Sequence, residues 1–315
     1  MVGSFNVDHV WRCASLPAQG ATLAGVYASG PGGKGFNQAM AASRAGAATT
    51  FLCALGDDPG GAMAHALAAE AGIDLRAAPT IERTGTAGIF VDAHGNNSIV
   101  VGAGANAALG AAFIDAQRAR IEAAAVVLVQ LESPLAAVER ALALARGAGA
   151  TTILNPAPAN AETTPSLLAL ADALTPNETE FAALAARHLD VAIDPRAVAA
   201  TTDETLHALC RRLAPGGTVV ITLGAEGCFV SHSECRLRGD ATASFRIAAE
   251  PATPVDTTGA GDAFNGALAA AMASGGTDFA AQAGFAGRYA ALSTEAAGAA
   301  LAMPLRAAVE ARFPA

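Results

Sequence analysis

The chain is poor in charge, aromatic residues and cysteine, and it has no long hydrophobic run. Charged residues make up 15% of its 315 positions, and the formal net charge is -9. A negative chain without a basic stripe is poorly suited to holding a phosphate backbone, so we expect no nucleic-acid partner. No apolar run approaches the roughly 20 residues of a membrane helix, so we also expect no membrane partner.

The N-terminal residues and the cysteines predict a cytoplasmic protein. Met1 leads directly into Gly3 to Asn6, without the basic and then apolar residues of a secretion signal. The five cysteines are odd in number and scattered, and none has the C-x-x-C spacing of a zinc or redox site. We therefore expect buried thiols in a reducing compartment. They are Cys13, Cys53, Cys210, Cys228 and Cys235.

Strand and helix patterns alternate through most of the sequence, and the 52% hydrophobic content allows a sizeable core. Continuous apolar runs such as Val126–Val129 are typical of a parallel sheet that is covered on both faces. The pattern predicts one α/β domain over residues 1–315, with a doubly wound, mostly parallel sheet flanked by helices. We expect strands at Thr50–Leu55, Ala125–Leu131, Thr151–Leu154 and Thr218–Leu223, and helices at Gln38–Arg44, Gly61–Ala71, Pro134–Arg146 and Asn265–Ala273.

Two stretches interrupt this alternation and predict a small β-sheet lid. They cover about 11–30 and 84–105. Each stretch has short, partly alternating strand patterns, with no helix between the strands of that stretch. In the second stretch, His94–Asn97 has the composition of a tight hairpin turn. A lid in this position would cover the carboxyl edge of the main sheet, where open α/β sheets bind ligands.

The first strand of the main sheet is unusually short. Only Met1 and Val2 precede Gly3, whereas a parallel strand normally has about five residues. Either the natural start lies upstream or the sheet tolerates a stub, and the sequence leaves both alternatives open.

The segment Val255–Phe264 places glycines directly before a predicted helix. Unpaired backbone N–H groups and the helix dipole make such a start a binding site for an anion. Asp262 lies in this helix start, and its ordinary interpretation is an N-terminal acid that caps the helix. A second carboxylate at Asp256 and the nearby glycines favour a base that accepts a hydroxyl proton beside a phosphoryl group.

A second glycine-rich segment, Gly32–Ala39, also leads into a helix. It is not a P-loop, because Gly35 follows Lys34 where Ser or Thr is required and Ala28 replaces the first glycine. Recognition of a polyol by Lys34 and Asn37 is the favoured interpretation, and a surface lysine is the alternative.

Further polar residues follow the predicted strands, at the ligand-binding edge of the sheet. Singly, each could be a loop cap or a surface charge. They are Asn6 and Asp8 after the first strand, Glu132 after Val126–Leu131, and Asn177 and Glu180 in a later loop. Thr222, Gly224 and Gly227 form a glycine-containing turn after Thr218–Leu223 that could admit a nucleotide.

The chain resembles the ribokinase or PfkB carbohydrate-kinase family over essentially its whole length. Six ordered motifs carry the resemblance: Gly32–Ala39, Gly102–Leu109, Gln130–Pro134, Asn155–Ala159, Thr175–Glu180 and Asp256–Asp262. The resemblance implies that Asp262 is the catalytic base and that Gly259, Ala260 and Gly261 form the hole for the transferred phosphoryl group. It assigns sugar binding to Asn6, Asp8, Gly33, Lys34, Asn37, Glu132 and Asp262.

The resemblance also implies nucleotide and metal sites. Asn177 and Glu180 match an element associated with Mg²⁺ and phosphate, and Thr222, Gly224, Gly227 and Gly261 match nucleotide-binding positions. An activating monovalent cation, usually K⁺, would be held by Asp256, Thr258, Ser293, Ala296, Gly298 and Ala302. Ala302 stands where a serine is expected, so it can offer only a carbonyl oxygen. The small sheet of this family commonly pairs subunits, which implies a homodimer through the lid.

The activity implied by the resemblance is ATP-dependent phosphorylation of D-ribose to ribose 5-phosphate. The alternatives in the same family are kinases of deoxyribose, a ketohexose or a nucleoside. A non-catalytic sugar-binding protein on the same fold is a different class of function. An oxidoreductase is a third class, but no credible dinucleotide fingerprint is present.

Overall fold

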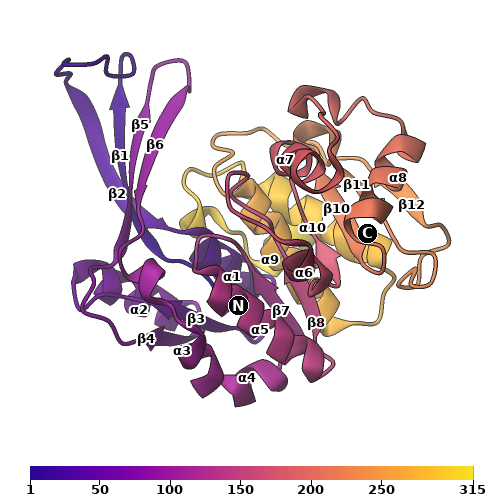
Figure 1. Cartoon of the computed structure of the whole chain (residues 1–315). Coiled ribbons are helices and arrows are strands. Elements are labelled where there is room, and N and C mark those ends of the chain that lie inside the picture. The colour runs from indigo at the N-terminus through magenta and orange to yellow at the C-terminus, as the bar shows by residue number, and fades with distance from the viewer. Residues whose placement is uncertain (315) are drawn as a thin grey trace.

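Two β-sheets organise the chain, a central sheet between helices and a narrow sheet that projects from it (Figure 1). The structure is a computed structural model and describes residues 1–314. In the central sheet, the order is β12 (Ser244–Ile247), β11 (Cys228–Ser231), β10 (Thr218–Thr222), β9 (Ala173–Leu174), β8 (Thr151–Leu154) and β7 (Val126–Val129). Strands β7 to β10 are parallel, and β11 and β12 are antiparallel additions at the edge. The predicted doubly wound, mostly parallel α/β sheet is therefore confirmed.

A single residue joins this sheet to two further parallel strands, β3 (Thr50–Ala54) and β4 (Asp74–Ala78). Val2 forms parallel bridges to Leu52 of β3 on one side and to Val129 of β7 on the other. The first strand is thus a stub in the middle of the sheet, as short as its sequence indicated.

Helices cover both faces of the central sheet, each over its own apolar cluster. One face carries α1 (Lys34–Arg44), α2 (Pro59–Glu70), α9 (Ala260–Ser274), α10 (Phe279–Ser293) and α11 (Arg306–Arg312). The other carries α3 (Ala111–Ala116), α4 (Arg118–Glu122), α5 (Leu135–Gly147), α6 (Pro165–Ala169), α7 (Glu178–Leu189) and α8 (Asp203–Leu213). No helix within residues 1–314 is both long and apolar enough to cross a membrane.

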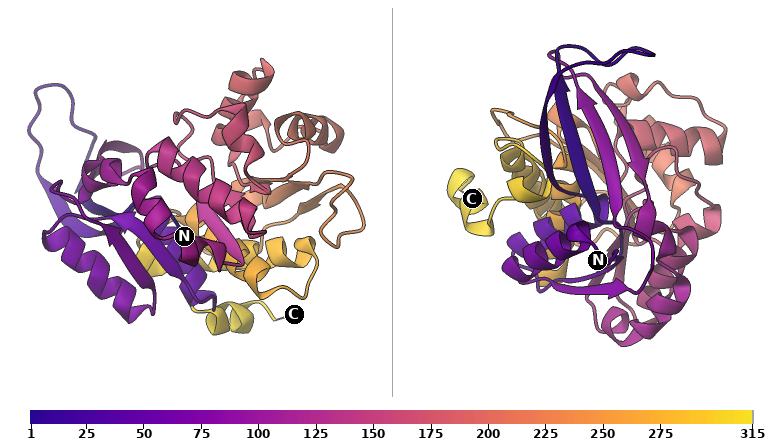
Figure 2. Two further views of the ribbon diagram at one scale, coloured as in Figure 1. Left: turned by 60° about the horizontal axis from the view of Figure 1, so that its bottom comes forward. Right: turned by 90° about the vertical axis from the view of Figure 1, so that its left-hand side faces the viewer.

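The projecting sheet, which we call the lid, has four strands and stands away from the layered body in each view of Figure 2. Their order is β2 (Gly25–Gly32), β1 (Asn6–Cys13), β5 (Gly85–Val91) and β6 (Asn97–Gly102). Strands β5 and β6 form the predicted hairpin, closed by a backbone hydrogen bond from Asp92 to Asn96. The first strand of the lid, β1, begins at Asn6, so the chain passes from Val2 in the central sheet into the lid within four residues.

Three local predictions were wrong. Helix α1 begins at Lys34, not at Gln38, because Gly33 adopts a φ of 86° that ends the preceding strand and lets the next residues enter the helix at once. Helix α9 begins at Ala260, not at Asn265, because Gly259, with a φ of 78°, is the N-cap. Cys235 is exposed and Cys13 is partly exposed, so only Cys53, Cys210 and Cys228 are the expected buried thiols.

Helices α1 and α9 pack unusually closely, because Gly266 of α9 faces the backbone of α1. A Cβ atom at Gly266 would lie 2.4 Å from the carbonyl oxygen of Gln38 and 2.5 Å from the Cβ of Ala41. Small residues of this kind bring two helix axes together, and a larger one forces them apart.

We predict that Gly266→Ala lowers the free energy of unfolding by about 1–3 kcal/mol, because the added methyl group overpacks the helix contact. Urea unfolding followed by circular dichroism would measure the change. The matched control is Gly284→Ala in α10, where a Cβ meets only the end of the Arg288 side chain at 4.0 Å. Because alanine is the better helix former, the control should gain about 0.5–1 kcal/mol. Equal effects of the two substitutions would contradict close packing at Gly266.

Candidate active site

The contact between α1 and α9 creates a buried carboxylate site at Asp262. This residue lies in the first turn of α9 and is only 7% exposed. Asn37 donates its side-chain amide to Oδ2 of Asp262 at 2.9 Å, and Gln38 donates to Oδ1 at the same distance. Both donors belong to α1, so two helix starts that are far apart in sequence together fix one carboxylate.

Gln38 is a site residue that the sequence analysis missed. Its amide nitrogen also donates to Oδ1 of Asn155 at 3.0 Å, and its carbonyl oxygen accepts a hydrogen bond from Gln130. The side chain is 0% exposed, so its orientation is set by these partners alone. The sequence signal for Gln38 was the pair Asn37-Gln38 directly after the glycine-rich loop. Ala39 and Met40 then continue the helix with apolar residues.

Burial raises the pKa of Asp262. The positive charge of Lys34 and the hydrogen bonds from Asn37 and Gln38 oppose this shift, and the charge of Glu132 adds to it. A carboxylate with a raised pKa is a stronger base once it is ionised, which suits removal of a proton from a hydroxyl group.

The predicted anion hole lies at the start of α9, and its glycines serve different purposes. Gly259 has a φ of 78°, and a Cβ there would lie 2.9 Å from the Cβ of Ala299, so neither the backbone nor the packing admits a side chain. A Cβ at Gly261 would meet nothing within 4 Å, although this residue lines two neighbouring cavities. The space at Gly261 is therefore open for a ligand, and no side chain caps the helix start.

A polar cavity of about 150 Å³ faces this helix start and includes Lys34. The sequence analysis grouped Lys34 with the sugar-binding residues, and the structure places it in one cavity with Asp262, Gly261 and Glu180. Burial works to lower the pKa of Lys34, but three nearby carboxylates raise it overall. They belong to Asp262, Glu132 and Glu180. A charged ammonium group therefore lies where an anionic phosphate would enter.

Asn177 and Glu180 form the capping box of α7. The backbone N–H of Asn177 donates to Glu180 at 2.9 Å, and the backbone N–H of Glu180 donates to Oδ1 of Asn177 at 2.8 Å. The capping interpretation of these residues therefore holds, and their position in the polar cavity leaves room for a second role. Burial raises the pKa of Glu180.

A larger, mainly apolar cavity of about 520 Å³ adjoins the polar one. Thr222, Gly224 and Gly227 line it, together with Phe264 and residues of α10. The two cavities share four lining residues, which are Thr222, Thr257, Ala260 and Gly261. An apolar cavity that meets a polar cavity at a helix start has the polarity of a nucleotide, with the base suited to one part and the phosphates to the other.

The predicted sugar-binding residues surround Asp262 from the lid side. Glu132 accepts hydrogen bonds from the Ser4 hydroxyl at 2.6 Å and from the backbone N–H of Lys34 at 3.0 Å. Asn6 accepts one from Asn106 at 2.8 Å, which explains the role of the motif that contains Asn106. Within the part of the chain that the structure describes, Oδ1 of Asn37 is buried without a partner, so it could accept a ligand hydroxyl.

Asp8 completes this polar group at the base of the lid. Burial raises its pKa to about 7, and the charges of Glu132 and Asp262 contribute to the shift. A Cβ at Gly32 would lie 2.2 Å from the Asp8 carboxylate, and a Cβ at Gly33 would lie 2.8 Å from the backbone nitrogen of Asn6. The paired glycines therefore let the backbone pass close beneath the side chain of Asp8.

The two loops predicted to bind a monovalent cation are joined by hydrogen bonds, but only some of the predicted residues take part. Asp256 accepts backbone hydrogen bonds from Thr258 at 2.9 Å and from Gly298 at 3.0 Å, which joins the two loops. Ser293 donates its hydroxyl to the carbonyl of Ala290, and the predicted Ala296 and Ala302 have no side-chain oxygen. Residues 1–314 contain no group of three or more His, Cys, Asp and Glu side chains that could hold a metal.

The fold and this site have known relatives. Residues 1–306 match the pfkB family of carbohydrate kinases. Ribokinase from Haemophilus influenzae is 39% identical over 86% of this chain and 84% of its own, and deoxyribokinase from Salmonella typhi is 32% identical over 85% and 83%. The structure of Arabidopsis thaliana ribokinase complexed with ribose and ATP has a TM-score of 0.84 and 29% identity, covering 98% of this chain and 96% of that one.

These findings define the class of protein as a phosphotransferase that acts on carbohydrates. The chain belongs to the pfkB family of carbohydrate kinases, and it is a sugar kinase. The family resemblance that the motifs indicated is thereby confirmed.

We predict that Asp8→Asn stabilises the free protein more at pH 8 than at pH 5. The pKa of Asp8 is about 7 in the folded protein against 3.8 ordinarily, so its ionisation costs stability fully above about pH 7 and not at all below 3.8. The gain at pH 8 should exceed that at pH 5 by on the order of 2 kcal/mol. Thermal unfolding at both values would measure it.

The control for this prediction is Asp57→Asn, which changes an exposed carboxylate in the loop before α2. It should alter stability little at either pH. A gain from Asp8→Asn that is equal at pH 5 and pH 8 would show that Asp8 is already ionised without cost.

Proposed function

We propose that this sugar kinase transfers the γ-phosphoryl group of ATP to the primary hydroxyl of D-ribose, with Asp262 as the base. The observation that carries the proposal is the place of Asp262, which is buried and held by Asn37 and Gln38 next to the open helix start at Gly261. Relatives named ribokinase and a structural neighbour complexed with ribose and ATP support the choice of substrates.

In the proposed reaction, Asp262 takes the proton of the sugar hydroxyl while the hydroxyl oxygen attacks the γ-phosphorus. The bond from that phosphorus to the bridging oxygen breaks, and ADP leaves with the bonding electrons. The backbone N–H groups of Gly259, Ala260 and Gly261 would stabilise the charge on the transferred group, and Lys34 lines the same cavity. Asn37 and Gln38 keep the base aligned with the attacking oxygen.

The apolar cavity beside Gly261 would hold the nucleotide base, with Thr222, Gly224 and Gly227 at its edge. Mg²⁺ typically binds through one or two carboxylates together with substrate phosphates and water. The buried carboxylate of Glu180, which lines the polar cavity, fits that requirement, and the backbone N–H of Asn177 holds it through a hydrogen bond. When bound, the ion would neutralise the charge on the nucleotide phosphates.

We further propose that K⁺ activates the enzyme through the loops joined at Asp256. The carboxylate of Asp256 and main-chain carbonyls near Thr258 and Gly298 form an oxygen-only donor set, which suits a hard cation. Ser293, Ala296 and Ala302 would contribute carbonyl oxygens, because the first uses its hydroxyl internally and the others have none.

The lid is the surface that we propose for a homodimer. Its strands carry large exposed apolar side chains, which are Val26, Tyr27, Ile99, Val100 and Val101. Large apolar side chains gathered on the exposed strands of one small sheet favour an interaction site. Pairing of two lids would also cover the open edges of β2 and β6.

A panel of acceptors tests the substrate. We expect the highest kcat/KM with D-ribose in a coupled assay for ADP, because the polar groups at Asn6, Asp8 and Glu132 are suited to a fully hydroxylated pentose. The panel contains 2-deoxy-D-ribose, D-fructose and adenosine, each assayed with and without K⁺. The similarity to a deoxyribokinase makes 2-deoxy-D-ribose the rival. A higher kcat/KM for any rival would reject the ribose assignment, and identical rates without K⁺ would reject cation activation.

Replacing the base tests the mechanism. Asp262→Asn should lower kcat by about 10²–10⁴-fold, because the amide cannot accept the hydroxyl proton. Binding of D-ribose, measured by calorimetry, should change only a few-fold, since asparagine retains the shape of the side chain. The exposed Asp57→Asn serves as the control and should keep full activity. A near-normal rate in Asp262→Asn would show that another group removes the proton.

A further inference from the structure

A closed circuit of buried hydrogen bonds joins two neighbouring residues of α9. It begins at the carboxylate of Asp262 and returns to the carbonyl oxygen of Gly261, the residue before it. Because one set of side chains contacts both residues, the base and the helix start beside it are held together. The members of the circuit, in order, are Gln38, Asn155, Thr175 and Asn265.

Each contact in the circuit has a defined donor. Gln38 donates its side-chain amide to Oδ1 of Asn155 at 3.0 Å, and Asn155 donates its own amide to the carbonyl of Thr175 at 2.9 Å. The hydroxyl of Thr175 donates to Oδ1 of Asn265. Asn265 then donates its amide nitrogen to the carbonyl of Gly261 at 2.8 Å.

These four polar side chains are enclosed. The exposed fraction is 0% for Gln38 and 5% for Asn155, and it is 1% for both Thr175 and Asn265. An enclosed amide or hydroxyl group that loses its partner is costly, so the circuit strongly favours the arrangement just described. Asn155, Thr175 and Asn265 also line the polar cavity that includes Gly261, which places the circuit in the wall of the cavity proposed for the phosphates.

The hydroxyl of Thr175 determines which way the amide of Asn265 faces. Oδ1 of Asn265 can only accept a hydrogen bond, so it turns toward the hydroxyl and leaves the amide nitrogen facing Gly261. The carbonyl of Gly261 can also only accept, so the reverse orientation would bring two oxygen atoms together. Removing the hydroxyl would therefore remove the contact that secures this orientation.

The hydrogen bond from Asn265 acts on a backbone donor at the helix start. The carbonyl of Gly261 and the N–H of Asp262 belong to one planar trans peptide group, so they point in opposite directions. Asp262 lies in the first turn of α9, where an N–H group has no acceptor within the helix. A hydrogen bond to the carbonyl polarises the peptide group and makes this N–H a stronger donor.

We propose that Asn265 is a positioning residue for phosphoryl transfer and that Thr175 holds it in place. By donating to the carbonyl of Gly261, Asn265 fixes the next peptide group and makes the N–H of Asp262 a further donor to the transferred phosphoryl group. This donor acts on charge that develops during transfer, so it contributes more to the transition state than to substrate binding. The inference rests on the proposed function of the α9 start as the phosphoryl site.

Removal of one hydroxyl group tests the inference. Thr175→Val should lower kcat by about 10-fold, which is less than the loss of a whole donor, because the amide of Asn265 is no longer secured. The KM values for the sugar and for ATP should change less than ~3-fold, since the groups that face both substrates remain. Thr175→Ser restores the hydroxyl and should recover kcat to within ~3-fold of the original enzyme. The assay uses whichever sugar of the panel is the best acceptor, so its result does not depend on ribose.

Thr152→Val is the matched control for the threonine variant. Thr152 is 0% exposed and lies at the opposite end of β8 from Asn155, and its hydroxyl donates to the carbonyl of Leu170 at 2.7 Å. The control should lower the Tm and leave kcat unchanged. A purely structural role of Thr175 would give this same result for Thr175→Val.

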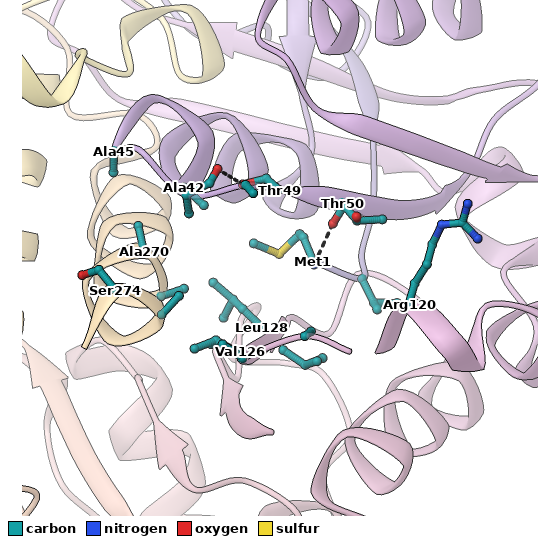
Figure 3. A pocket seen from close by; sticks show the side chains of 18 of the residues that line it. Met1, Ala42, Ala45, Thr49, Thr50, Arg120, Val126, Leu128, Ala270 and Ser274 are labelled. Atoms are coloured by element: carbon teal, nitrogen blue, oxygen red, sulfur yellow. Dashed lines mark hydrogen bonds between the residues drawn. The ribbon is translucent and has the colours of Figure 1, made fainter. Parts of the chain in front are cut away.

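Asn265→Leu tests the other partner of the contact. Leucine has a similar shape but no donor, so kcat should again fall by about 10-fold. Adding Thr175→Val to this variant should lower kcat by less than ~2-fold more, because both changes remove one interaction. The control is Ser274→Ala at the far end of α9, beside a separate cavity (Figure 3). Ser274 donates to the carbonyl of Ala271 at 2.9 Å, and the loss of this bond should leave kcat unchanged.

Three results would each overturn the inference. They are an unchanged kcat in Thr175→Val, a loss that appears in KM and not in kcat, and losses that multiply in the double variant. Thr175→Val and Thr175→Ser decide the question even if Asn265→Leu does not fold. Failure of the proposed base gives a different pattern, in which Asp262→Asn keeps a near-normal rate while Thr175→Val still loses kcat.

Discussion

The active site depends on the close contact between α1 and α9. Gly266 lets the two helices approach until the start of α1 reaches the first turn of α9. At this point Asn37 and Gln38 hold both oxygens of Asp262. The position of the carboxylate is therefore set by helix packing and not by a loop, and such a position is more precise than one on a loop.

The same packing concentrates carboxylates beside one ammonium group. Asp8, Glu132 and Asp262 lie close enough to influence one another, and Lys34 is the cation that their charges favour. Burial raises the pKa of both aspartates, so the free site carries an electrostatic cost. A ligand hydroxyl that donates a hydrogen bond to these carboxylates would reduce this cost.

Much of this arrangement could be predicted from the sequence, because the relevant signals are local. Apolar runs such as Val126–Val129 indicated the parallel sheet, and the glycines before Asp262 indicated a helix start that could hold an anion. Contacts between distant segments could not be read in this way. Gln38 resembles any polar residue in a helix until Asn155 and Gln130 are brought to it. The placement of Lys34 in one cavity with Gly261 likewise depends on how α1 meets α9.

The segment between the central sheet and β1 ties the lid to the core. Between the bridge at Val2 and the start of β1 at Asn6, Phe5 is fully buried and packs edge-on against Phe36 of α1, with ring centroids 5.0 Å apart. Asn106 accepts a hydrogen bond from the backbone N–H of Phe5 and donates to its carbonyl and to Asn6. These contacts anchor the base of the lid on the same helix that positions Asp262. Asn6 and Asp8 therefore keep their relation to Asp262 through α1.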